Sequence, residues 1–282
     1  MRLANVDERV MVAREGGGFV DLAVAIAGQF GPDPQTVYER WEEFTDWANG
    51  VPEWTDAGYE PGPATLGPPA PRPRQVFATA LNYREHAAEG GAPAPPAPQV
   101  FTKFPSCLAG PHTVVELATD RVDWEAELVV VIGRRAHHVP RAEAWEHVAG
   151  VMAGQDVSAR DVQRTSPQES QFSLGKSFPG FGPTGPWLVS RDEFGERDVR
   201  IECLLNGELV QSASTAEMIF PVAVLIEYIS AITPMLPGDL LFTGTPSGVG
   251  AHRRPPRFLT DGDVVVTRIE GIGELTQSFR AR

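Results

Sequence analysis

The chain has 282 residues and a mass of 30.6 kDa, enough for one large domain or for a large and a small one. Hydrophobic residues make up 42% and charged residues 22%, a balance typical of a soluble globular protein, so wholesale disorder is excluded. The net charge of −13 disfavours nucleic acid as a partner, because a polyanion is repelled. No apolar run is long enough to span a membrane and no apolar signal core begins the chain, so we expect a cytoplasmic protein without a membrane partner.

The first 75 residues predict a hairpin, then helices, then a linker. Apolar segments at 3–6 and 10–13 flank a charged turn, which favours two short strands. Residues 33–47 repeat apolar or aromatic side chains at helical spacing, with a proline in the first turn. Residues 51–75 are rich in proline, which favours extended backbone and is typical of a linker.

Strand signals dominate after residue 75. Five segments predict strands, namely 75–81, 128–133, 199–205, 240–243 and 264–269. Asn206-Gly207 predicts a type I′ hairpin turn into another strand. Helices are expected only at 83–89, 141–149 and 220–232. Cys107 and Cys203 lie in unlike contexts and are expected to be reduced core thiols.

Two glutamates, Glu125 and Glu127, stand two positions apart where a continuous apolar strand is predicted to begin. Side chains at this spacing point to the same face of a strand, roughly 7 Å apart. Like charges so placed repel unless a proton or a cation lies between them, and Mg²⁺ prefers carboxylate oxygens. The alternative is a solvated strand edge, since this spacing is common.

Asp156 adds a third carboxylate to the candidate metal site. A strand–helix–strand return through residues 141–149 would bring Asp156 back beside the two glutamates. The three side chains would then form an acidic face, with further coordination positions left to water or substrate. Asp161 is an alternative ligand, but the helical run after Ser158 is expected to turn it away.

His86 and Glu89 are spaced i,i+3 on a predicted helix, so their side chains are neighbours. An imidazole oriented by a carboxylate can take a proton from water near neutral pH. The alternative is an exposed helical pair without function, and Glu85 is a competing but less well placed partner.

Two further features suit a small anionic substrate. Lys176 is a lone lysine among small and apolar residues, which suits a ligand for a substrate anion or oxyanion; the alternative is an ordinary surface lysine. Thr245 lies in a glycine-rich loop whose amides suit a carboxylate or phosphate. The loop lacks the P-loop and GxGxxG patterns, so ATP and nicotinamide cofactors are disfavoured.

The order of these motifs resembles the fumarylacetoacetate hydrolase family, in particular its acylpyruvate hydrolase and 2-hydroxyhepta-2,4-diene-1,7-dioate isomerase branch. The resemblance runs from residue 75 to the C-terminus. Its motifs are Asn82-Tyr-x-x-His86-x-x-Glu89, Asp123-x-Glu125-x-Glu127-Leu, Asp156-Val-Ser-Ala-Arg-Asp161-x-Gln163, Gly175-Lys-Ser-Phe and Thr243-Gly-Thr-Pro-x-Gly-Val-Gly. The chain departs from the family at Ala80, at Phe178-Pro-Gly-Phe-Gly and in the proline-rich stretch 90–98.

The resemblance implies a strand-rich α+β fold, a mixed β-sandwich roll with a small N-terminal α/β domain, in a homodimer. Residues 1–70 would form the small domain and its proline-rich linker, and residues 71–282 the catalytic domain. The matched motifs imply a Mg²⁺ or Mn²⁺ site at Glu125, Glu127 and Asp156, a water-activating dyad at His86 and Glu89, and substrate contacts at Gln163, Lys176 and Thr245, with Lys176 also neutralising developing charge.

The expected reaction is metal-dependent hydrolysis of a carbon–carbon bond in an acylpyruvate-like 2,4-diketo acid. The metal would stabilise a pyruvate enolate, and His86 would take the proton of the attacking water. The resemblance leaves open an oxaloacetate decarboxylase or a 2-oxo acid isomerase of the same family. A non-catalytic protein that binds a small acid is the alternative of another class.

Overall fold

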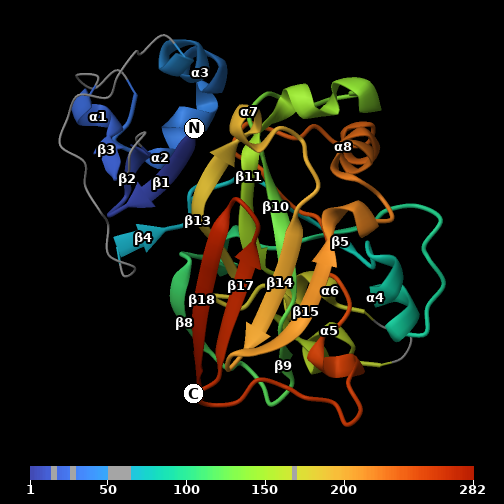
Figure 1. The fold of residues 1–282 in the computed structure, drawn as a ribbon. Helices are drawn as coiled ribbons and strands as arrows, with labels where there is room; N and C mark the ends of the chain where they lie inside the picture. The colour runs from blue at the N-terminus through green and yellow to red at the C-terminus, as the bar shows by residue number, and fades with distance from the viewer. Residues whose placement is uncertain (14–17, 26–29, 50–64, 167–169) are drawn as a thin grey trace.

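The N-terminal part of the chain joins a large sheet and covers one of its faces (Figure 1). The computed structural model describes residues 1–13, 18–25, 30–49, 65–166 and 170–282. The predicted hairpin is confirmed: β1 (Arg2–Val6) and β2 (Arg9–Ala13) pair antiparallel, and β3 (Phe19–Asp21) extends them. Helices α1 (Leu22–Ala25), α2 (Pro34–Glu39) and α3 (Trp41–Asn49) follow.

The helical pattern at 33–47 is confirmed as two helices, because Arg40 leaves the helical conformation and separates α2 from α3. Asp33 caps α2 by accepting a hydrogen bond from Gln35 N, and Pro34 occupies the first turn as expected. The break lets Tyr38 and Trp41 both pack on the sheet, where their rings stack. Burial of the two aromatic side chains therefore outweighs the uninterrupted helical period.

The predicted linker is only partly described. Residues 51–64 lie outside the described residues. The short strand β4 (Leu66–Gly67) pairs with β1, so this part of the predicted linker is a strand. The division of the chain at residue 70 stays a prediction.

The large sheet contains eleven strands of the described chain, in the order β3-β2-β1-β13-β11-β10-β16-β5-β6, with β4 and β7 as side branches. It is mixed, because β5 and β16 pair in parallel while β10 pairs antiparallel with both neighbours. The bounds of its other strands are β5 (Val76–Ala80), β6 (Gln99–Thr102), β7 (Leu108–Ala109), β10 (Ala126–Ile132), β11 (Val148–Gln155), β13 (Gly182–Ser190) and β16 (Leu240–Phe242).

A second sheet packs on the large one, with the order β15-β14-β17-β18-β8. Its strands are β8 (His112–Glu116), β14 (Arg200–Leu205), β15 (Glu208–Ser214), β17 (Val264–Ile269) and β18 (Gly273–Arg280). Asn206 and Gly207, both with positive φ, join β14 to β15 as the predicted hairpin turn. A two-stranded pair, β9 (Val122–Asp123) and β12 (Ser158–Ala159), lies beside the site.

Strand β10 is buried on both faces, which explains its continuous apolar sequence. Val129 and Val131 face a core shared with α2 and α3, whereas Leu128, Val130 and Ile132 face the core between the two sheets. All five predicted strands after residue 75 are present. The strand-rich α+β class is therefore confirmed.

One helix prediction fails at the end of β11 that lies away from Asp156. Residues 141–149 were expected to be helical, but a 3₁₀ helix, η3 (Arg141–His147), ends before β11 begins at Val148. Every residue of β11 is buried between β10 and β13, so tertiary pairing overrides the local pattern. The other two predicted helices are confirmed as α4 (Arg84–Glu89) and α8 (Val222–Ser230).

The remaining helices are short: α5 (Arg160–Gln163), α6 (Phe172–Gly175), α7 (Arg191–Phe194), η2 (Pro105–Cys107), η4 (Thr215–Glu217) and η5 (Gly250–His252). In the described ranges, no helix combines the length and apolar character needed to cross a membrane. Cys107 and Cys203 are free and buried, as expected.

Candidate active site

Four strand ends bring the candidate residues together at one edge of the large sheet. Glu125 and Glu127 lie where β10 begins, and Asp156 follows the end of its antiparallel partner β11. The Asp156 amide donates to Glu125 O at 2.8 Å, so the third carboxylate returns beside the first as predicted. Strands β16 and β5 are parallel and end at the same edge, where they lead into the glycine-rich loop and helix α4.

Glu125, Glu127 and Asp156 form a compact carboxylate group. One ligand oxygen from each lies within 4.8 Å of the others. The three residues are 5%, 1% and 1% exposed, so the alternative of a solvated strand edge is wrong. Asp161 does not belong to this group; it is exposed on α5 and accepts a hydrogen bond from Thr119 Oγ1.

Three cationic side chains partly neutralise the carboxylate group. Lys176 Nζ lies 2.6 Å from Glu125 Oε2 and 2.5 Å from Asp156 Oδ2. Lys103 Nζ donates to Asp156 Oδ1 at 2.6 Å, and Arg160 lies 2.7 Å from Glu125 Oε1. Lys176 is 2% exposed, so the alternative of an ordinary surface lysine is wrong.

The compensation is uneven across the three carboxylates. Burial alone would raise the pKa of Glu125, but Lys176 and Arg160 outweigh it and hold that pKa well below its ordinary value. Burial, reinforced by the charges of Asp156 and Glu125, raises the pKa of Glu127 well above its ordinary value. Among the described residues, Glu127 has no cationic side chain in ion-pair contact.

This uneven compensation fits a divalent cation. Glu127 is a buried carboxylate with no cationic side chain in contact among the described residues, and an ion among the three carboxylates would supply the positive charge. An all-oxygen ligand set suits a hard ion that keeps water or substrate oxygens at its other positions. Glu125, Glu127 and Asp156 are therefore the residues that could hold such an ion.

His86 and Glu89 are in contact, as their spacing predicts. His86 Nδ1 lies 2.8 Å from Glu89 Oε1, and the side chains are 8% and 23% exposed. The His86 side chain is therefore enclosed, unlike an ordinary exposed helical pair. Glu85 does not compete for His86; its Oε2 accepts a hydrogen bond from Ser247 Oγ instead.

The glycine-rich loop holds carboxylates of the chain itself. Gly244 N donates to Glu127 Oε2 at 2.7 Å, and Gly248 N lies 3.1 and 3.0 Å from the two oxygens of Glu89. Gly244 has φ +98°, and a Cβ there would lie 2.7 Å from Asn82 Cβ, so only glycine fits. Burial would raise the pKa of Glu89, but His252, His86 and the Gly248 amide together lower it to about 2.

A cavity of about 280 Å³ joins the two groups. Five predicted site residues line it, namely His86, Glu125, Gln163, Lys176 and Thr245. Glu89 and Asp156 are not lining residues but bond directly to His86 and Lys176. Phe101 and Phe172 add an apolar wall, with ring centroids 5.5 Å apart.

The two predicted substrate contacts retain different hydrogen-bonding capacity. Gln163 Oε1 accepts from Arg160 Nη1 at 3.0 Å, and no described residue accepts a hydrogen bond from its amide NH₂, which can therefore donate to a ligand. The Thr245 hydroxyl donates to Ala126 O at 2.9 Å and accepts from Gln211 Nε2, so towards a ligand it can only accept.

Several residues at the site were not found by sequence reasoning. Lys103 lies in the segment Phe-Thr-Lys-Phe-Pro, where no residue spacing indicates a function. Arg160 lies in the motif that begins at Asp156, but the sequence alone indicates no role for it. His252 approaches Glu89 from η5, far along the chain. Each of these contacts depends on the packing of distant segments, which single-sequence patterns do not report.

Comparison with known proteins identifies the family of the chain. Residues 75–280 match the family described as Fumarylacetoacetate (FAA) hydrolase C-terminal. The human protein named oxaloacetate tautomerase FAHD2A, mitochondrial, is 43% identical over 208 residues, covering 73% of this chain. The match spans 66% of that relative's length, just under two thirds.

Two solved structures extend the comparison to the fold. A protein described as HpcE from Mycobacterium smegmatis has a TM-score of 0.90 and 48% identity, covering 100% of this chain and 99% of its own. Fumarylpyruvate hydrolase from Pseudomonas aeruginosa, in complex with Mn²⁺ and pyruvate, has a TM-score of 0.69 and 28% identity, covering 80% of this chain and 100% of its own. The family match covers most of the chain, and the chain belongs to the fumarylacetoacetate hydrolase family.

Proposed function

We propose that the chain is a Mg²⁺- or Mn²⁺-dependent hydrolase that cleaves a carbon–carbon bond in an acylpyruvate-like 2,4-diketo acid. The observation that carries the proposal is a single cavity lined by His86, Glu125 and Lys176. In the proposed reaction a proton acceptor, a carboxylate of the candidate cation site and a buried ammonium would surround one small substrate. The likeness to fumarylpyruvate hydrolase with bound Mn²⁺ and pyruvate supports both the ion and the 2-oxo acid class.

The proposed ligands of the ion are Glu125, Glu127 and Asp156. When bound, the ion supplies Lewis-acid polarisation of substrate oxygens and stabilises negative charge that develops on them. Both Mg²⁺ and Mn²⁺ accept carboxylate oxygens as ligands, so metal-dependent turnover has to be measured with each ion.

The dyad moves the proton. Glu89 stays ionised, because its pKa is about 2, and it holds His86 through Nδ1. His86 Nε2 is then the nitrogen that takes a proton from water while the water oxygen attacks the distal carbonyl carbon. The carbon–carbon bond breaks, its electron pair forms the enolate of pyruvate, and the enolate carbon takes up a proton. The products are pyruvate and the carboxylic acid of the acyl group.

Lys176 stabilises negative charge in this cavity. Burial lowers its pKa, but Asp156 and Glu125 more than reverse that effect, so the side chain remains an ammonium. Its two short ion pairs use two of three N–H groups, which leaves one for a substrate oxygen. The free amide of Gln163 and the accepting hydroxyl of Thr245 are the proposed further contacts to substrate.

A second candidate function is isomerisation of a 2-oxo acid, for which oxaloacetate keto–enol tautomerisation is the specific case. The 43% identity to the human oxaloacetate tautomerase favours it. The same His86–Glu89 pair would move a proton between carbon and oxygen, and no water would be consumed. The isomerase would therefore use the same residues as the hydrolase, but only the hydrolase needs water as a nucleophile.

The deciding experiment supplies metal-stripped protein with acylpyruvates and oxaloacetate, with and without Mg²⁺ or Mn²⁺. We expect pyruvate and an equimolar carboxylic acid from an acylpyruvate, only with metal, and Asp156→Asn should abolish this turnover. Faster keto–enol exchange of oxaloacetate without cleavage of any acylpyruvate would favour the tautomerase, and release of CO₂ would indicate a decarboxylase. Thermal stabilisation by these acids without any product would support a binding protein instead.

A further inference from the structure

His252 adds a second imidazole to the His86–Glu89 pair. It ends the 3₁₀ helix η5 (Gly250–His252) on the wall of the cavity. The amides of Gly250 and Ala251 donate to the two oxygens of Asp123 at 2.7 and 2.9 Å, and Asp123 is fully buried. The backbone that carries His252 is therefore held in place by contacts outside the His86–Glu89 pair.

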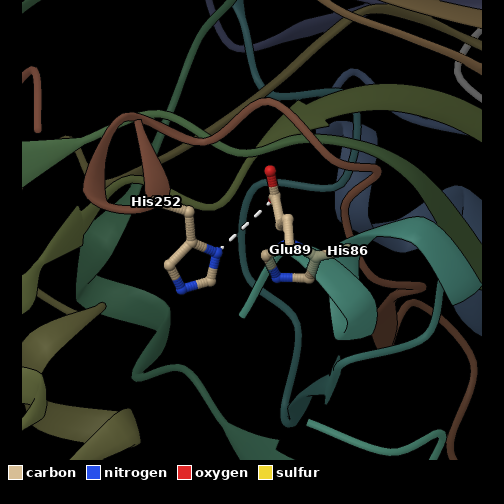
Figure 2. A group of neighbouring side chains, drawn as sticks. All are labelled: His86, Glu89 and His252. Atoms are coloured by element: carbon tan, nitrogen blue, oxygen red, sulfur yellow. Dashed lines mark hydrogen bonds and ion pairs between the residues drawn. The ribbon is translucent and has the colours of Figure 1, made fainter. Parts of the chain in front are cut away.

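Both imidazoles turn Nδ1 towards one carboxylate oxygen. Figure 2 shows the line from His252 to Glu89, with the His86 ring beside it. Glu89 Oε1 lies 2.8 Å from His86 Nδ1 and 3.5 Å from His252 Nδ1. The ring centroids are 5.5 Å apart. His252 Nδ1 is buried, yet no described residue gives it a hydrogen bond of acceptable geometry. One ligand atom from each of the three side chains lies within 4.8 Å of the others.

These distances suit a tetrahedral transition-metal ion. Ligands bound to Zn²⁺ at about 2.0–2.1 Å are about 3.3 Å apart in a tetrahedral site. The separation of Glu89 Oε1 from His252 Nδ1 already matches, and the shorter contact to His86 Nδ1 has to open slightly. Two imidazoles, one carboxylate and a cavity that supplies a fourth ligand make the donor set of an open zinc site. Mg²⁺ prefers oxygen ligands, so the nearby carboxylate group remains its site.

We infer that His86, Glu89 and His252 form a second cation site, selective for Zn²⁺ or a similar borderline-soft ion, and that the ion bound there inhibits the enzyme. Binding at His86 Nδ1 requires the tautomer in which Nε2 carries the ring proton. The proton on Nδ1 moves to Nε2, the ring stays neutral, and Nε2 can no longer accept a proton from water. The inhibition rests on the proposed function, whereas the binding does not.

The first test measures binding without turnover. Zn²⁺ is titrated into protein saturated with Mg²⁺, by calorimetry, and Co²⁺ is used as a spectroscopic probe of four-coordinate geometry. His252→Gln should weaken Zn²⁺ binding by about 100-fold through loss of one of three protein ligands, whereas His112→Gln, on β8 of the other sheet, should change it less than about twofold. Equal affinity in the wild type and His252→Gln would overturn the site.

A second variant separates the two cation sites. Glu127→Gln removes a ligand of the carboxylate group but none of the proposed zinc site, so it should still bind one Zn²⁺ ion. Loss of all Zn²⁺ binding in Glu127→Gln would assign the ion to the carboxylates and overturn the inference.

The activity arm uses the Mg²⁺-loaded enzyme with its best substrate. Zn²⁺ should inhibit the wild type at concentrations that leave His252→Gln active, and the inhibition constant should shift with the binding constant. His252-dependent binding without inhibition would overturn the inhibitory role. An enzyme that turns over no substrate even before Zn²⁺ is added signals failure of the proposed function alone, since the binding titration still reports on the site.

Discussion

The carboxylate group reaches the cavity through Glu125, and the histidine–glutamate group reaches it through His86 and His252, but the two groups are built in opposite ways. The carboxylates stand on paired strands, are at most 5% exposed, and are held by Lys103, Lys176 and Arg160. Glu89 and its two histidines lie on a short helix and a 3₁₀ turn, with side chains 8% to 27% exposed. The strands supply a buried, charged site, and α4 supplies the His86–Glu89 pair, which can exchange protons with water.

If this contrast holds, replacing a dyad residue changes the reaction but not metal binding. His86→Gln should lower kcat by about 10² to 10⁴-fold, the usual contribution of a general base, with the Mg²⁺ affinity of the carboxylate group unchanged. Steady-state kinetics and a metal titration measure the two effects. Glu85→Gln on the same helix is the matched control and should stay within about twofold, because Glu85 is exposed and, among the described residues, its carboxylate has a side-chain hydrogen bond only from Ser247 Oγ. An equal loss in both variants would remove His86 from the proposed role.

Replacing a cation behind the carboxylates should instead destabilise the fold. Lys103 is fully buried, and Lys103→Met leaves the charge of Asp156 partly unpaired. We expect the free energy of unfolding to fall by about 3–5 kcal/mol, measured by urea denaturation of metal-stripped protein. Arg280→Met breaks an exposed ion pair to Glu116 and should change it by less than about 1 kcal/mol. Similar changes in the two variants would show that the buried charges contribute no more than surface pairs.

The smallest expected effect is a pH-dependent contribution from Glu89. Its pKa is lowered to about 2 in the folded chain, compared with about 4.3 when unfolded. The stabilisation is therefore complete above the unfolded pKa and disappears as the pH falls through about 2. Glu89→Gln should lower the free energy of unfolding by about 1–3 kcal/mol at pH 7, and the difference should shrink below about pH 4. A difference that is constant from pH 7 to pH 3 would contradict this linkage.

The local parts of this contrast were predictable from sequence. The i,i+3 spacing of His86 and Glu89 predicts their contact once a helix is assumed, and the two-residue spacing of Glu125 and Glu127 predicts a shared face. The position of Asp156 beside the two glutamates was also predictable, although the helical connection predicted to lead to it is absent. A helix is predicted over residues 141–149, but the chain forms a 3₁₀ helix only to His147 and then enters β11 at Val148. Burial of β11 between two strands decides this conformation.

Long-range contacts were not predictable in the same way. Lys103 and Asp156 are 53 positions apart, and Glu89 and Gly248 are 159 apart, so no short pattern relates them. The homodimer, the cytoplasmic location and the division at residue 70 stay predictions.

The sequence by itself determined the strand-rich class, the hairpin at Asn206-Gly207 and the identity of the acidic and histidine candidates, because alternation, turn chemistry and short spacings act over a few residues. Only the tertiary structure decided that Lys176 is buried against two carboxylates, that the loop amides hold Glu127 and Glu89, and that His252 faces the dyad. These outcomes depend on which strand ends meet at one edge of the large sheet. A buried charge there is costly unless it is paired, and its partners come from distant segments of the chain.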